Sequence, residues 1–168
     1  DLLIEDTCDE KIKSGKLVCK SGKRNHFFNI ENFIPRFIKN LNYADSFGEQ
    51  WKRFAKTQID TNLLNESELR WNSEIGWDRV DLKGKKVIEF GSGAGRFIDL
   101  VSKRGADLVI GLDASYAVDA AQESLKDKNN IFFIQADIFS PPIKKNYFDF
   151  GYSIGVLHHT PDPEKAFR

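Results

Sequence analysis

The sequence is poor in the features that mark several classes of protein. Its 168 residues include two cysteines and no methionine, and no apolar run comes near the roughly 20 residues that a membrane-spanning helix needs. Two cysteines are too few for a disulfide framework, which favours the reducing cytoplasm as the location. Because the chain begins at Asp1 rather than at a methionine, we expect its natural start to lie upstream.

The sequence also lacks a net charge. Lysine plus arginine and aspartate plus glutamate both number 25, so no global basic field points to nucleic acid as a partner. The basic run from Lys11 to Arg24 is more simply interpreted as a solvated surface. An apolar content of 40% is typical of a globular protein. We therefore expect a small-molecule partner, with nucleic acid disfavoured and no membrane, and we leave the oligomeric state open.

The chain divides into three predicted segments. Residues 1–42 contain short extended pieces broken by turns at Ser14-Gly15 and Ser21-Gly22, which predicts a small β-rich segment. Residues 43–80 are predicted to form a helical linker, since Phe47, Trp51 and Phe54 recur at near-helical spacing. Core packing is the simpler role for these aromatic residues, although Trp51 or Phe54 could also contact a ligand.

Residues 81–168 show regular alternation of strand and helix patterns. Apolar strands are expected at 87–90, 108–112, 131–135 and 148–153, and helices at 96–104 and 115–125. Such alternation predicts an α/β fold with a Rossmann-like, doubly wound parallel sheet. Ligands of these sheets bind at the carboxyl ends of the strands, which directs attention to the turns that follow them.

The turn after the first of these strands is rich in glycine. Gly91, Gly93 and Gly95 alternate with small residues and precede a helix, an arrangement that lets a ligand approach the backbone and the helix N-terminus. The dinucleotide fingerprint requires a third glycine where this chain has Arg96, and no Gly-Lys-Ser/Thr of a phosphate loop follows. The glycine turn alone therefore does not identify the ligand.

Acidic residues and a histidine pair complete the pattern in order along the chain. Glu89 precedes the turn, Asp113 ends the second strand, Asp137 follows the third, and Leu157-His158-His159 follows the fourth. Residues 84–168 resemble the first half of a class I S-adenosylmethionine-dependent methyltransferase, of the small-molecule, type 11-like group. That fold normally has seven strands and about four are present, so we expect a chain truncated at its C-terminus that lacks turnover by itself.

The resemblance implies a role for each matching residue. Glu89 would hold the amino group of the methionine moiety, and Asp113 would accept hydrogen bonds from both ribose hydroxyls. The remaining cofactor-binding residues would be Gly91, Ser92, Gly93 and Gly95 under the cofactor, Ala114, Asp137 and Ile138 around the adenine, and Ser153 and Ile154 at the methionine end.

Two alternatives for these residues stay open. Asp113 and Asp137 could instead cap the helices that follow their strands. His158 and His159 could act as a general base, because histidine titrates near neutral pH, but the resemblance supplies them only as a recurring loop element. No residue is therefore assigned as catalytic.

The N-terminal segment resembles a second known element, the small zinc-ribbon-like domain of the Trm112 type. That domain would normally supply two Cys-x-x-Cys pairs to zinc. Here Lys11 and Gly22 stand where partners of Cys8 and Cys19 would be, and His26 is the only other soft ligand nearby. We therefore predict no bound metal, with apolar packing in its place.

The function that follows is S-adenosylmethionine-dependent methyl transfer to a small-molecule or sugar-type acceptor. The alternatives are a non-catalytic, methyltransferase-like binding module and, behind it, an NAD-binding oxidoreductase, against which Arg96 counts.

Overall fold

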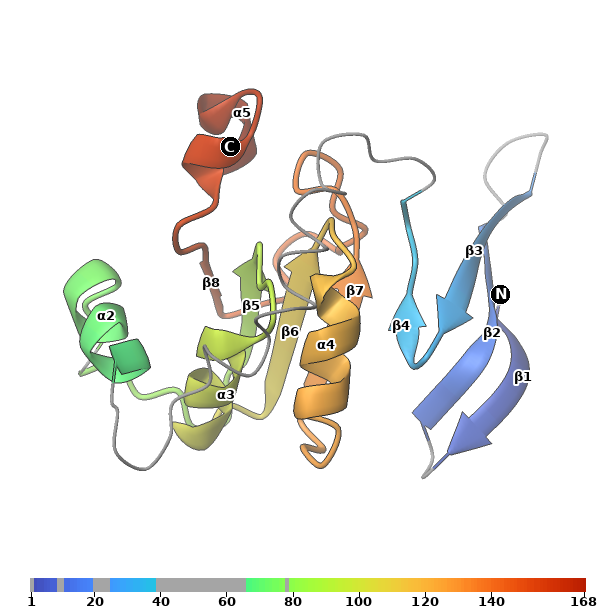
Figure 1. The fold of residues 1–168 in the computed structure, drawn as a ribbon, viewed down its shortest axis with the longest axis horizontal. Helices are drawn as coiled ribbons and strands as arrows, with labels where there is room; N and C mark the ends of the chain where they lie inside the picture. Colours follow the sequence, from blue (N-terminus) through green and yellow to red (C-terminus); the bar gives the residue numbers. More distant parts are fainter. Residues whose placement is uncertain (1, 9–10, 20–24, 39–65, 78) are drawn as a thin grey trace.

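A computed structural model describes residues 2–8, 11–19, 25–38, 66–77 and 79–168, and contains two β-sheets (Figure 1). The first is an antiparallel sheet whose strands follow one another in chain order. Its strands are β1 (Leu2–Cys8), β2 (Lys11–Cys19), β3 (His26–Glu31) and β4 (Ile34–Pro35). The short strand β4 coincides with Ile34-Pro35, where proline restricts the preceding residue to extended geometry.

The second sheet is parallel and has the strand order β7-β6-β5-β8. Its strands are β5 (Lys86–Phe90), β6 (Leu108–Asp113), β7 (Ile131–Gln135) and β8 (Phe150–Tyr152). The chain moves outward from β5 to β7 and then returns to the other side of β5, so the strand order reverses beside β5 while all strands stay parallel. The predicted Rossmann-like α/β fold is confirmed.

Helices α3 (Arg96–Lys103) and α4 (Ala117–Ser124) cover one face of this sheet (Figure 1). Successive right-handed crossovers that move in the same direction place their helices on the same face. Apolar residues of this face form one core cluster, which includes Val101, Val118 and Phe133. The other face carries Ile88 and Ile110, which are covered by side chains outside the helices, including Phe37, Ile143 and Phe148.

The antiparallel sheet contacts the parallel sheet along the edge strand β7. Just after β4, Arg36 forms a parallel bridge with Gln135, and the Phe37 N–H donates to the Gln135 carbonyl at 2.8 Å. Ile34 of β4 is fully buried in the same core cluster as α3 and α4. The antiparallel sheet is thus packed against the parallel one, and its boundary at residue 42 stays a prediction.

Helix α2 (Glu66–Glu74) lies within the predicted helical linker, whereas Phe47, Trp51 and Phe54 lie outside the described residues. Its Trp71 is fully buried. The Trp71 ring packs edge-on against Tyr152 with centroids 4.8 Å apart, and also contacts Phe97 and Trp77. One aromatic side chain therefore joins α2 to β8 and α3.

The chain ends with the 3₁₀-helix η2 (Leu157–His159) and helix α5 (Pro163–Phe167). Pro163 begins α5, and Asp162 accepts a hydrogen bond from the Lys165 N–H as its N-cap, as the Pro-Asp-Pro sequence predicts. Among the described residues, no helix has the length and apolar character needed to cross a membrane.

Trp71→Ala is expected to lower the free energy of unfolding by about 3–5 kcal/mol, because a large buried aromatic side chain leaves a cavity. Leu69→Ala on the same helix is the control, since Leu69 is 70% exposed, and should change stability by less than about 0.5 kcal/mol. Urea unfolding measured by circular dichroism compares the two. Equal losses would contradict the role given to Trp71.

Candidate cofactor site

The glycine turn after β5 is held by the end of β6. The N–H groups of Gly91 and Ser92 donate to the Leu112 carbonyl at 2.7 and 3.1 Å. The Gly93 N–H donates to Oδ2 of Asp113 at 2.8 Å. Two residues that are 20 positions apart therefore meet at the carboxyl ends of neighbouring strands, where ligands of parallel sheets bind.

Asp113 is fixed on its other side by Ser115. Oδ1 of Asp113 accepts hydrogen bonds from the Ser115 N–H at 2.8 Å and from the Ser115 hydroxyl at 2.7 Å. Helix α4 has Tyr116 as its N-cap residue, without a side-chain cap. The helix-cap alternative for Asp113 is thus wrong. Oδ2 has a single protein partner among the described residues and retains a lone pair for a further donor.

Asp137 lies one strand further out, directly after Ala136, whose N–H donates to the Asp113 carbonyl at 3.0 Å. Oδ1 of Asp137 accepts from the Phe139 N–H at 3.0 Å within a local turn. No helix follows it between residues 138 and 149 of the described chain, so the cap alternative is wrong here too. Asp113 therefore ends β6, and Asp137 follows the end of the adjacent strand β7, with Ala114 and Ile138 half-buried beside them.

Glu89 is a buried carboxyl group in the parallel sheet, 1% exposed. It stands opposite Tyr152 in the β5–β8 register, and the Tyr152 hydroxyl donates to Oε2 of Glu89 at 3.2 Å. Burial raises the pKa of Glu89 well above its usual value; the Tyr152 hydrogen bond lowers the pKa, and the nearby charge of Asp113 raises it further. Burial and the facing Glu89 also raise the pKa of Tyr152.

The loop after β8 covers the glycine turn. The Ser153 hydroxyl donates to the Phe90 carbonyl at 2.8 Å. Ile154 packs its side chain into the core cluster, which leaves its backbone as the part that can face a ligand. Val156 lies directly against Gly91, and a Cβ added at Gly91 would overlap the Val156 side chain. Gly91 is thus required by close packing as well as by its φ of +79°.

The histidine pair and Arg96 are also singled out by the sequence. His158 and His159 are exposed on η2, with ring centroids 3.9 Å apart. The Arg96 Nε group donates to the Ser67 hydroxyl at 2.7 Å, so this side chain is directed toward α2. Arg96 therefore serves the packing of the two helices.

Sequence reasoning missed Gly111, Gln135, Tyr152 and Val156. A Cβ at Gly111 would lie 2.6 Å from the Phe133 ring and 2.8 Å from the Ser92 hydroxyl. A glycine inside an apolar strand is a recognisable signal of such close approach. Gln135, Tyr152 and Val156 gave no comparable signal, because their roles depend on strand register and loop position.

The potential metal ligands of the N-terminal sheet lie at opposite ends of β2. Cys8 pairs with Lys11 at one end, and Cys19 pairs with His26 at the other. Eight residues of strand separate the two ends by about 26 Å. Within the described residues, no group of three or more His, Cys, Asp or Glu side chains is placed to hold a metal ion.

Comparison with known proteins gives the fold a family context. Residues 88–168 match the methyltransferase domain family. A curated relative, a tRNA U34 carboxymethyltransferase of Ruthia magnifica, is 31% identical over 144 residues, which cover 79% of this chain and 44% of that protein. The chain therefore spans less than half of that relative's length.

Two solved structures share this fold. A proposed S-adenosyl-L-methionine-dependent methyltransferase from Methanococcus maripaludis superposes with a TM-score of 0.60 at 23% identity, covering 79% of this chain and 60% of that one. An S-adenosylmethionine-dependent methyltransferase from Mesorhizobium loti gives 0.52 at 26% identity, covering 61% and 46%. Residues 88–168 therefore match the methyltransferase domain family and share the fold of S-adenosylmethionine-dependent methyltransferases.

Gly91→Ala and Gly84→Ala separate the two constraints on Gly91. Both glycines have a positive φ, but only Gly91 has a side chain packed on it; the space around Gly84 is open. We expect Gly84→Ala to cost roughly 1–2 kcal/mol of stability through backbone strain alone. Gly91→Ala should cost about 1–3 kcal/mol more because Val156 must move. Thermal unfolding of both variants tests this, and equal costs would contradict the packing of Val156 on the turn.

Proposed function

We propose, from the methyltransferase domain in residues 88–168, that this protein transfers a methyl group from S-adenosylmethionine to a small-molecule or sugar-type acceptor. The observation that carries the proposal is the contact between Asp113 and the Gly93 N–H. It joins a carboxylate at the end of one strand to a glycine turn at the end of the next, and both face the place where parallel sheets bind ligands.

The chemistry of the donor set fits the cofactor. Asp113 is assigned to the ribose hydroxyls, because a carboxylate accepts from two neighbouring hydroxyls. Asp137 and the Ile138 N–H are assigned to the adenine, with Ala114 against the ring. Glu89 is assigned to the amino group of the methionine moiety, since an ammonium group would stabilise a buried carboxylate. Gly91, Ser92, Gly93 and Gly95 provide the surface beneath, and Ser153 and Ile154 border the methionine end.

When bound, S-adenosylmethionine supplies an activated methyl group on a sulfonium, so this chain needs no nucleophile of its own. The contribution of the residues is to hold the donor rigidly and to exclude water from the site. Val156 and Ser153 lie on the turn and narrow the space at that end. A general base is needed only for acceptors that must lose a proton, and no residue is assigned to that role.

A second candidate acceptor is a tRNA uridine, because the curated relative is named for that substrate and its similarity extends beyond residues 88–168 to 79% of this chain. The balanced charge of 25 basic and 25 acidic residues supports the small-molecule acceptor. Fluorescence anisotropy with labelled tRNA at increasing salt separates the two. Saturable binding that weakens steeply with salt would favour tRNA, and its absence at low salt would favour the small molecule.

Calorimetric titration with S-adenosylhomocysteine, with NADH as control, tests the proposal itself. Binding of S-adenosylhomocysteine alone is expected, because Arg96 replaces the third glycine of a dinucleotide site. Binding of NADH alone would support an oxidoreductase, and binding of neither would support a non-catalytic module.

Asp113→Ala is expected to weaken S-adenosylhomocysteine binding by about 1–3 kcal/mol, because two hydroxyls lose a charged acceptor. Asp113→Asn keeps one carbonyl acceptor and should lie between the wild type and the alanine variant. Asp81→Ala is the matched control, since Asp81 accepts from a backbone N–H in an exposed turn, at 2.9 Å from Lys83. Unchanged affinity in a folded Asp113→Ala protein would refute the assignment.

Glu89→Gln is expected to change how both stability and binding depend on pH. Because the pKa of Glu89 is higher in the folded protein than in the unfolded chain, the wild type loses stability as pH rises from the unfolded pKa up to the folded one. The glutamine variant should therefore gain stability relative to the wild type as pH increases. Urea unfolding between pH 5 and pH 9 measures this difference, and parallel curves would contradict the burial of an ionisable Glu89.

The same variant should bind S-adenosylhomocysteine more weakly, with an affinity that no longer rises with pH. In the wild type the ligand ammonium favours the ionised carboxylate, so binding releases a proton. Calorimetry in two buffers with different ionisation enthalpies detects that proton. If the wild type and the Glu89→Gln variant both release a proton, the proton comes from a group other than Glu89.

A further inference from the structure

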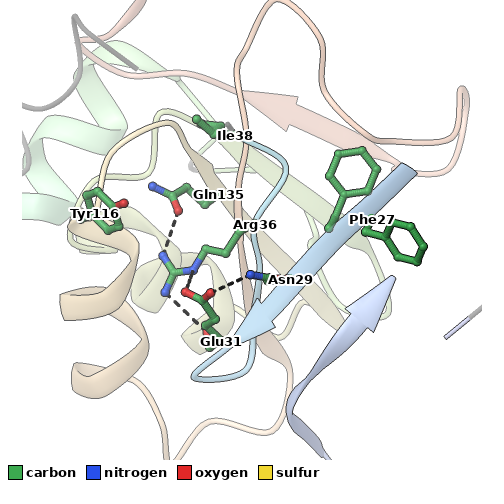
Figure 2. A pocket seen from close by; sticks show the side chains of 8 residues that line it. Phe27, Asn29, Glu31, Arg36, Ile38, Tyr116 and Gln135 are labelled. Atoms are coloured by element: carbon green, nitrogen blue, oxygen red, sulfur yellow. Dashed lines mark hydrogen bonds and ion pairs between the residues drawn. The ribbon is translucent and has the colours of Figure 1, made fainter. Parts of the chain in front are cut away.

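Arg36 connects the N-terminal sheet to the parallel sheet, and its side chain is only 10% exposed (Figure 2). Its Nη2 and Nη1 groups donate to Oδ1 and Oδ2 of Asp119 on α4 at 2.6 and 3.0 Å, a two-pronged contact. Nη1 also donates to Oε1 of Gln135 at 3.0 Å. This geometry matches the planar fork of arginine, and lysine cannot reproduce it.

Gln135 links Arg36 to the loop beside the predicted adenine site. Its Nε2 group donates to the Ala114 carbonyl at 3.1 Å. Its backbone carbonyl accepts from the Phe37 N–H at 2.8 Å, and it pairs with Asp113 in the β6–β7 register. The buried amide of Gln135 is therefore oriented by Arg36 on one side and holds the residue after Asp113 on the other.

The pocket next to these residues does not by itself indicate a ligand. It has a volume of about 230 Å³ and is bordered by Phe27 and Tyr116, each about half exposed. The four N–H groups on the terminal nitrogens of Arg36 have acceptors, the fourth being the Glu31 carbonyl at 3.5 Å. The Arg36 Nε group lies 3.9 Å from a Glu31 carboxylate oxygen. The guanidinium is thus used to hold protein groups together.

We infer that Arg36 and Gln135 are positioning residues for the adenosine end of the cofactor site. The inference rests on the proposed function. Arg36 sets the orientation of the Gln135 amide, and the amide fixes the backbone at Ala114, between the carboxylate of Asp113 and the start of α4. The N-terminal sheet thereby takes part in cofactor recognition without touching the cofactor.

Calorimetric titration of the chain with S-adenosylhomocysteine and with 5′-methylthioadenosine tests the inference. The second ligand has the adenosine group but lacks the amino acid portion. Arg36→Lys and Gln135→Met should weaken both ligands by a similar factor, roughly three- to tenfold. Glu89→Gln should weaken only S-adenosylhomocysteine, because Glu89 is assigned to the amino group.

Arg104→Lys is the matched control. Arg104 is another partly buried arginine, 20% exposed, and contacts Glu68 and the Trp77 carbonyl at the far end of α3. It should leave both affinities unchanged even if it lowers the melting temperature. Since Gln135→Met leaves the Arg36–Asp119 pair in place, it gives a folded test if Arg36→Lys does not fold.

The outcomes separate the inference from the proposed function. If the wild type binds both ligands and Gln135→Met binds them with unchanged affinity, the inference is overturned and the function stands. An equal loss for Arg104→Lys would also overturn it, because the effect would then follow general stability. A wild type that binds neither ligand would overturn the proposed function and this inference with it.

Discussion

The hydrogen bonds between the glycine turn and the end of β6 are the constraint on which the site depends. The Leu112 carbonyl receives two N–H groups of the turn, and Asp113 receives a third. These contacts hold the turn against the end of β6. Gly91 also lies against Val156, with no room for a side chain between them. Buried Glu89 lies in β5 just before the turn, in a setting that favours its protonated form.

The burial of Glu89 lowers the stability of the fold when the carboxyl group ionises, and a cationic ligand would offset this loss. A carboxyl group without a charged partner destabilises the fold when it ionises, and among the described residues Tyr152 supplies Glu89 with only a neutral hydroxyl. A cationic group in the site would instead favour the ionised form of Glu89. Such a residue is better explained by binding than by stability, since a glutamine would keep the contact with Tyr152 at lower cost.

The parallel sheet and the order of its carboxylates could be predicted because short stretches of the sequence indicate them. Apolar strands alternate with helices, and Glu89, Asp113 and Asp137 each stand at a strand end. Tyr152 and Gln135 could not be assigned in the same way, since their partners lie 63 residues away at Glu89 and 99 residues away at Arg36. The small N-terminal sheet was predicted as β-rich, but its union with β7 depends on Ile34 and Phe37, which read from the sequence as ordinary apolar residues.

The position of Ile34 and Arg36 also sets an order for folding during synthesis. The N-terminal strands leave the ribosome before the parallel sheet, yet Ile34 is buried against helices made some 60 to 90 residues later, and Gln135 follows Arg36 by 99 residues. Until β7 has emerged, the apolar Ile34 and the charged Arg36 lack the surroundings that they have in the finished fold. Closing so long a segment is slow compared with local contacts. Ile34 and Arg36 are made early and therefore reach their final surroundings only after β7 has been made.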